Sequence, residues 1–111
     1  MDFEVKQNSN GSVVVSKTAK LTASNAAELK EAFHSLNKGS VNTIILDLEE
    51  TKYCDSSGLS AILLGNRLCK DTNGRFILTS LQPTVLKVIQ IAQLDKVLQI
   101  FENQEEALKT L

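Results

Sequence analysis

Short apolar runs alternate along this chain with segments of helical period, and this alternation restricts the fold more than any other feature. The run from 41 to 48 and the run Phe76-Ile77-Leu78 are nearly continuous in apolar content, which is typical of strands covered on both faces. Between strand-like runs, apolar residues recur every three or four positions, as in Ala26, Leu29, Phe33 and Leu36. Strands that alternate with helices form parallel units with right-handed crossovers.

The remaining segments complete a β-β-α-β-α-β-α-β-α order. Asn10-Gly11 is a hairpin turn signal between the first two strands. The sequence therefore predicts one small α/β domain over residues 1–111, with a mixed sheet and helices packed mainly on one face. Its further expected elements are strands at 3–6, 13–15 and 97–101, and helices at 59–70, from Pro83 onward and after Asn103.

Two helices carry additional local signals. Asn25 stands three residues before Glu28, a pattern typical of a capping box, and Gly39 lies where a left-handed C-terminal cap is expected. The helix at 59–70 has an apolar stripe broad enough to predict packing against both the sheet and a neighbour. That stripe consists of Leu59, Ile62, Leu63, Leu64 and Leu68.

Composition excludes several classes of function. Twelve basic and thirteen acidic side chains give a formal charge of -1, which disfavours non-specific nucleic-acid binding and a polybasic membrane-surface role. No apolar run approaches the roughly 18 residues of a membrane span, and residues 1–6 do not resemble a signal peptide. We therefore expect a cytoplasmic protein. Its two cysteines and one histidine are too few for a metal site, and no cofactor is expected.

One segment differs from generic architecture: Tyr53-Cys54-Asp55-Ser56-Ser57-Gly58-Leu59. It joins a central strand to the next helix, at the sheet end where α/β proteins usually meet ligands and partners. Asp55 or Ser56 could simply cap the helix. However, two serines stand where one cap would suffice, and Gly58 falls in the first turn, where glycine costs about 0.5–1 kcal/mol relative to alanine. A bare backbone at Gly58 would let another molecule come close.

A lightly covered serine at a helix N-terminus suits reversible phosphorylation. The helix dipole and free N–H groups can hold a phosphoryl group of about -1.5 to -2 charges without unfolding the domain. A docked partner would have to desolvate this charge together with that of Asp55. A loss of about 3 kcal/mol, near 150-fold in affinity, is expected.

At these residues the chain resembles the STAS domain, and within it the stand-alone anti-sigma factor antagonists of bacteria. The resemblance covers essentially all 111 residues. The most specific match is Asp55-Ser56-Ser57-Gly58-Leu59 before an apolar helix. The other matching segments are residues 21–29, Ile44-Ile45-Leu46-Asp47-Leu48, residues 83–89 and Leu94-Asp95-Lys96-Val97.

The resemblance implies that Ser57, directly before the glycine, is the phosphoacceptor. It also implies a partner, an anti-sigma factor that is a serine kinase with a histidine-kinase-like ATPase fold. Unphosphorylated antagonist binds this kinase and frees the sigma factor, phosphorylation ends the interaction, and a metal-dependent serine phosphatase resets the switch. The family's acid before the first helix is replaced here by Thr22. The partner-binding residues implied are Thr22, Ser24, Asp55, Ser56, Ser57, Gly58 and Leu59.

Other functions make different predictions. A hydrolase triad would need His34, the only histidine, to reach Ser57, and no nucleophile-elbow motif surrounds that serine. No Walker sequence for a nucleotide is present, so we expect a protein that is not an enzyme. A STAS accessory subunit of a lipid-transport ATPase, or a scaffold of a stress-signalling complex, would dock constantly without phosphate control. Cys54 is expected to be a buried small hydrophobe.

Overall fold

The computed structural model describes residues 2–8, 11–39 and 41–111. Within these ranges, no helix has the length and apolar content that crossing a membrane requires. The strands are β1 (Phe3–Asn8), β2 (Gly11–Ser16), β3 (Lys20–Leu21), β4 (Thr43–Asp47), β5 (Tyr53–Cys54), β6 (Arg75–Thr79) and β7 (Gln99–Phe101). The helices are α1 (Ala26–Lys38), α2 (Ser56–Asp71), α3 (Pro83–Ile91) and α4 (Gln104–Leu108), with a 3-10 turn, η1, at Leu94–Lys96.

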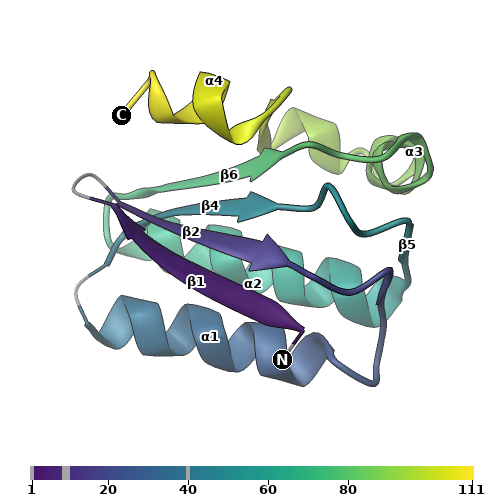
Figure 1. Cartoon of the computed structure of the whole chain (residues 1–111), viewed down its shortest axis with the longest axis horizontal. Coiled ribbons are helices and arrows are strands. Elements are labelled where there is room, and N and C mark those ends of the chain that lie inside the picture. Colours follow the sequence, from purple (N-terminus) through teal and green to yellow (C-terminus); the bar gives the residue numbers. More distant parts are fainter. Residues whose placement is uncertain (1, 9–10, 40) are drawn as a thin grey trace.

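Five of the strands form one mixed sheet in the order β1-β2-β4-β6-β7. β1 runs antiparallel to β2 at one edge, and the other neighbours are parallel. This arrangement confirms the predicted hairpin and the predicted α/β class. The predicted turn at Asn10-Gly11 falls partly outside the described residues. The carboxyl ends of β2, β4 and β6 lie at the end of the molecule where β5 leads into α2 (Figure 1).

Helices α1 and α2 cover one face of the sheet, as predicted (Figure 1). Between them and the sheet lies the main core, which includes the fully buried Leu29, Phe33 and Ile62. The helices come close because α2 carries Gly65, where an added Cβ would lie 2.5 Å from the ring of Phe76 and 2.9 Å from that of Phe33. Those two rings pack edge to face with centroids 5.4 Å apart.

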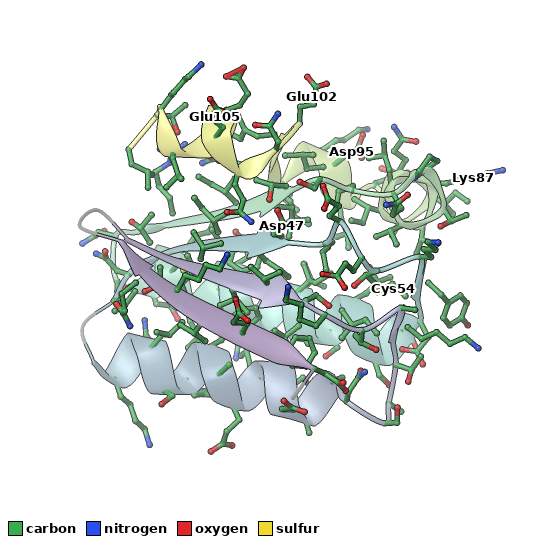
Figure 2. The ribbon with its side chains drawn as sticks, viewed as in Figure 1. Asp47, Cys54, Lys87, Asp95, Glu102 and Glu105 are labelled. Atoms are coloured by element: carbon green, nitrogen blue, oxygen red, sulfur yellow. The ribbon has the colours of Figure 1, made fainter. Side chains whose placement is uncertain are left out.

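The opposite face of the sheet is covered by α4 (Figure 1). Ala107 of α4 packs on a second cluster that contains Val13, Val15, Ile45 and Ile77. Two polar contacts hold α4 in place: Gln104 Nε2 donates to Asp47 Oδ2 at 2.9 Å, and the Arg75 guanidinium donates to Thr110. Figure 2 shows Asp47 between the sheet and α4.

Asn25 and Gly39 are the cap residues of α1, as predicted, but neither has the predicted cap geometry. Asn25 is the N-cap residue, but its side chain makes no cap hydrogen bond to α1. Its Oδ1 instead accepts from Thr22 N at 3.0 Å, and its Nδ2 donates to the carbonyl of Lys20. Gly39 has φ of -81°, so it is not left-handed. In contrast, Asn103 does cap α4, because its side chain accepts from Glu106 N.

Candidate functional site

Two connections that lie far apart in the sequence meet beside the main sheet. β3, before α1, pairs in parallel with β5, before α2, through Lys20↔Tyr53 and Leu21↔Cys54. The Asp55 N–H extends this pairing by donating to Leu21 O at 3.1 Å. The sequence does not predict these strands, since two residues are too few to show a period. The pairing places the segment before α1 against the segment that carries the serines.

Asp55 is the residue that fixes this arrangement. It is the N-cap of α2, and its Oδ1 accepts from the Gly58 N–H at 2.9 Å. Its other oxygen, Oδ2, accepts from the Ala23 N–H at 3.3 Å. The capping interpretation is therefore confirmed for Asp55 rather than Ser56. One carboxylate holds both the start of α2 and the loop that precedes α1.

The two serines occupy the first two positions of α2. Ser56 is exposed and Ser57 is half-buried. Among the described residues, neither hydroxyl takes part in a hydrogen bond. Since the first N–H groups of a helix lack partners within it, both serines lie at a site of positive potential. The Ser57 hydroxyl is thus neither sealed in the interior nor committed to another group.

The interpretation of Gly58 as an opening for another molecule is wrong. Gly58 is buried, and a Cβ there would lie 2.6 Å from Cys54 Sγ, 2.7 Å from Leu21 O and 2.9 Å from Leu21 Cγ. The space that the missing side chain leaves is filled by the protein's own β3 and β5. Gly58 therefore lets α2 begin directly against this strand pair.

Cys54 lies behind the site, on the strand that leads into α2 (Figure 2). It is buried, and it is a free cysteine. Burial, and to a smaller extent the neighbouring charge of Asp55, raise the pKa of its thiol to about 11. A thiol with so high a pKa is almost wholly protonated at neutral pH. Cys54 thus serves as a small packing residue, as the sequence indicates.

The other residues implied as partner contacts lie on α2 and on the loop that the Ala23–Asp55 hydrogen bond joins to its start. Thr22 is half-buried and Ser24 is exposed, and their hydroxyl oxygens lie 2.9 Å apart. Leu59 is half-buried on α2. Tyr53, which the sequence analysis did not single out as a contact, is 53% exposed on β5. An exposed aromatic residue is a common anchor in protein interfaces.

The position of His34 does not assemble a catalytic triad. His34 is exposed in α1, eight residues beyond the first residue of that helix. At 1.5 Å per residue, it lies about 12 Å along the helix from the end where Ala23 contacts Asp55. Among the described residues, no hydrogen bond joins it to either serine.

The architecture and the loop geometry agree with a known family. The family model described as the STAS domain matches residues 2–107. This chain belongs to the STAS domain family. The strand pair β3–β5, the capped start of α2 and the serines are thus features of a STAS domain.

Relatives of this STAS domain include anti-sigma factor antagonists. A Paenibacillus polymyxa anti-sigma F factor antagonist is 31% identical over 68 residues, which cover 61% of this chain and 58% of that relative. The match thus spans less than two thirds of the relative's length. A Thermotoga maritima protein proposed to be an anti-sigma factor antagonist has a similar structure, with a TM-score of 0.87 and 26% identity over 97% of this chain and 92% of that one.

A phosphorylated relative is also known in structure. The Bacillus cell fate determinant SpoIIAA in its phosphorylated form matches this STAS domain with a TM-score of 0.77 and 25% identity, over 97% of each chain. The fold of this family therefore accommodates the phosphorylated state of at least that relative.

Proposed function

We propose that this STAS domain is an anti-sigma factor antagonist whose binding is controlled by phosphorylation of Ser57. The observation that carries the proposal is the state of the Ser57 hydroxyl. Ser57 is half-buried in the first turn of α2, and its hydroxyl forms no hydrogen bond among the described residues. Asp55 joins this turn to the loop before α1 through two hydrogen bonds. The antagonist relatives support the same function.

The acceptor is surrounded by a surface suited to a protein partner. Ser24, Ser56 and Tyr53 are exposed, and Thr22 and Leu59 are half-buried. Because Asp55 binds the N–H groups of Gly58 and Ala23, both loops have a fixed shape before any partner arrives. A preformed surface loses little conformational entropy on binding. We therefore assign partner contact to these residues, whereas Gly58 supports them from inside.

Phosphorylation would change charge without changing the fold. A partner kinase transfers the terminal phosphoryl group of ATP to the Ser57 oxygen, which releases ADP and the hydroxyl proton. The product carries about -1.5 to -2 charges at pH 7, held at the positive end of α2. This charge adds to that of Asp55 in a surface that docking would dehydrate. Buried unpaired charge is costly, so the partner dissociates.

The partner in this proposal is an anti-sigma factor that is a serine kinase with a histidine-kinase-like ATPase fold. The domain binds this kinase when Ser57 is bare and leaves the sigma factor free for transcription. A serine phosphatase of the metal-dependent class hydrolyses the phosphoester and restores binding. The domain itself contributes a substrate hydroxyl and a docking surface in the cytoplasm, and no catalysis.

Substitutions at Ser57 test this function. Wild-type, Ser57→Ala and Ser57→Asp proteins are used as baits in cytoplasmic extract of the native cell, and retained kinases are identified by mass spectrometry. We expect Ser57→Ala to retain the kinase as wild type does, and Ser57→Asp to lose binding by about 100-fold. The retained kinase with ATP should place one phosphate on wild type and none on Ser57→Ala.

Ser56→Ala is the matched control, because Ser56 is the adjacent, more exposed hydroxyl. It should accept phosphate as wild type does and retain the kinase far better than Ser57→Asp, because it adds no charge. The melting temperatures of all variants should differ little. Phosphate on another residue would show that the acceptor is wrongly assigned. Equal binding of Ser57→Asp and wild type would instead favour constant docking, as in a transporter accessory subunit or a scaffold.

A further inference from the structure

A groove of about 900 Å³ runs along the outer face of α2. It starts at Ser56, next to the proposed phosphoacceptor, and continues past Arg67 toward Asp71. Lys30 of α1 borders it on one side, and Ala92 and Leu94, after α3, border it on the other. The groove is therefore continuous with the site described above.

The floor of the groove is apolar. It is formed by Leu59, Leu63 and Leu64 of α2, together with Ala92 and Leu94. Leu59 and Leu94 also pack partly against the main core, but Leu63 and Leu64 do not belong to it. The buried positions of α2 are Gly58, Ala61, Ile62, Gly65 and Cys69. Leu63 is 37% exposed. The sequence predicted that this helix packs against the sheet and a neighbour, and α1 is that neighbour. Leu63 and Leu64 lie outside both hydrophobic clusters of the described residues.

The rim of the groove is positively charged. Lys30, Arg67 and Lys70 line it with one acid, Asp71. Among the described residues, none of these four forms a salt bridge. A surplus of cations here contrasts with the formal charge of -1 of the whole chain. An occupant with acidic side chains on its edges would satisfy these cations.

We infer that this groove binds an amphipathic helix of the partner protein, with leucine-like residues on one face and Asp or Glu beside them. Apolar residues at i, i+3, i+4 and i+7 of such a helix fill a hydrophobic groove. Its acids would meet Lys30, Arg67 and Lys70, which gives the interface specificity and a faster association rate. A flat bilayer could reach these cations but not the floor of a concave groove.

The inference rests on the proposed function for its link to regulation. Ser56 lines one end of the groove and precedes Ser57 in the chain. A phosphoryl group on Ser57 would add negative charge at that end and repel an acidic helix. The groove would then belong to the surface that phosphorylation switches.

A pair of designed peptides tests the groove without any kinase. The probe is a synthetic 18-residue amphipathic helix with Leu at i, i+3, i+4 and i+7 and Glu at the flanking positions. The matched peptide has Lys in place of every Glu. Amide NMR spectra of the domain are recorded with each. We expect the Glu peptide to shift the amides of Leu59, Leu63 and Arg67, and the Lys peptide to leave them unchanged.

Charge reversal provides the decisive comparison. Arg67→Glu with Lys70→Glu should weaken the Glu peptide about tenfold or more and create binding of the Lys peptide. Leu63→Ser should weaken the Glu peptide and leave the fold intact, since Leu63 is not part of the core. Lys87→Glu, an exposed cation of α3 outside the groove, should behave as wild type. Unchanged melting temperatures show that each variant is folded.

Three results would overturn the inference: no binding of the Glu peptide, equal binding of both peptides, or shifts confined to another face. Sedimentation with phosphatidylglycerol vesicles, in the absence of peptide binding, would identify a membrane surface instead. The peptide assay contains neither a sigma factor nor a kinase. Peptide binding can therefore be observed even if the Ser57 assays fail, and the Ser57 assays can succeed even if no peptide binds. The two proposals therefore fail separately.

Discussion

Within a single helical turn, Asp55, Ser57 and Gly58 each have a different physical role. The two carboxylate oxygens of Asp55 accept hydrogen bonds from the Gly58 N–H, in the first turn of α2, and from the Ala23 N–H, in the loop before α1. The hydroxyl of Ser57, the proposed phosphoacceptor, forms no hydrogen bond among the described residues. Gly58 has no side chain, so Leu21 and Cys54 can pack beneath the helix. The rigid and the reactive parts of the site are thus adjacent residues.

Gly58→Ala is expected to destabilise the domain. The added Cβ would meet a sulfur at 2.6 Å and a backbone oxygen at 2.7 Å, and the backbone oxygen cannot rotate away. Overpacking of this kind costs about 1–3 kcal/mol, which exceeds the helix-propensity gain of about 1 kcal/mol from Gly to Ala. Urea unfolding should report a net loss of up to about 2 kcal/mol.

Gly39→Ala is the matched control at the end of α1. Gly39 has φ of -81°, and a Cβ there would have its nearest neighbour at 3.5 Å, which is ordinary contact. We expect its free energy of unfolding to stay within about 0.5 kcal/mol of wild type. Equal stability of Gly58→Ala and Gly39→Ala would mean that the packing beneath α2 is looser than the distances indicate.

At the scale of elements, the site depends on how the starts of α1 and α2 are joined. The two-residue strands β3 and β5 bring the segments together, and the Asp55 side chain adds hydrogen bonds on both sides. Neither strand has enough hydrogen bonds to be stable alone, so the cap and the strand pair support each other. Loss of the cap should therefore loosen the loop as well as the helix.

Asp55→Ala should cost about 0.5–2 kcal/mol, the usual range for loss of an N-cap side chain. Thermal unfolding should show a lower melting temperature, and hydrogen exchange should be faster at the Ala23 and Gly58 amides. Ser56→Ala is the control, because its hydroxyl makes no hydrogen bond among the described residues. If both variants exchanged at the same rate, Asp55 would not be the residue that holds the loops together.

In the whole molecule, helices cover both faces of the main sheet, and the hydrophobic cluster on one face is larger than that on the other. α1 and α2 bury one face under a large core, whereas α4, five residues long, covers a smaller cluster on the other (Figure 1). The proposed site lies at the carboxyl ends of the strands, at the edge of the main core, which includes Leu21 and Cys54 beneath Gly58. A phosphate there can alter binding without disturbing the packing that holds the fold.

Ala107→Glu should separate α4 from the sheet. Ala107 is fully buried against Val13, Ile45 and Ile77, and a carboxylate in such a place has no partner to offset its desolvation. We expect a loss of about 3 kcal/mol in unfolding free energy and increased binding of a hydrophobic dye.

Ala27→Glu, on the exposed side of α1, is the corresponding control and should change stability by no more than about 0.5 kcal/mol. Retention of most helical signal in Ala107→Glu is expected, because α1 and α2 do not contact this cluster. A variant as stable as wild type would mean that α4 contributes little to the fold.

The sequence by itself determined the order of the main-sheet strands and the four helices, the class of sheet and the motif that carries the serines. These depend on local information: apolar period in α1 and α2, the continuous apolar content of β4 and β6, and Pro83 at the first position of α3. The capping of α4 by Asn103 was predictable for the same reason, since donor and acceptor lie within one turn.

Tertiary structure alone decided which groups the side chains and glycines of these elements contact. Asn25 has the right spacing for a cap, yet its side chain bonds Thr22 and Lys20, because the preceding loop offers better-placed partners. Gly58 suggested an opening, but Leu21, thirty-seven positions earlier, fills that space. Contacts between distant segments leave no period in the sequence. The pairing of β3 with β5, the double use of Asp55 and the leucines of α2 that lie outside the core clusters therefore became visible only when the chain was folded.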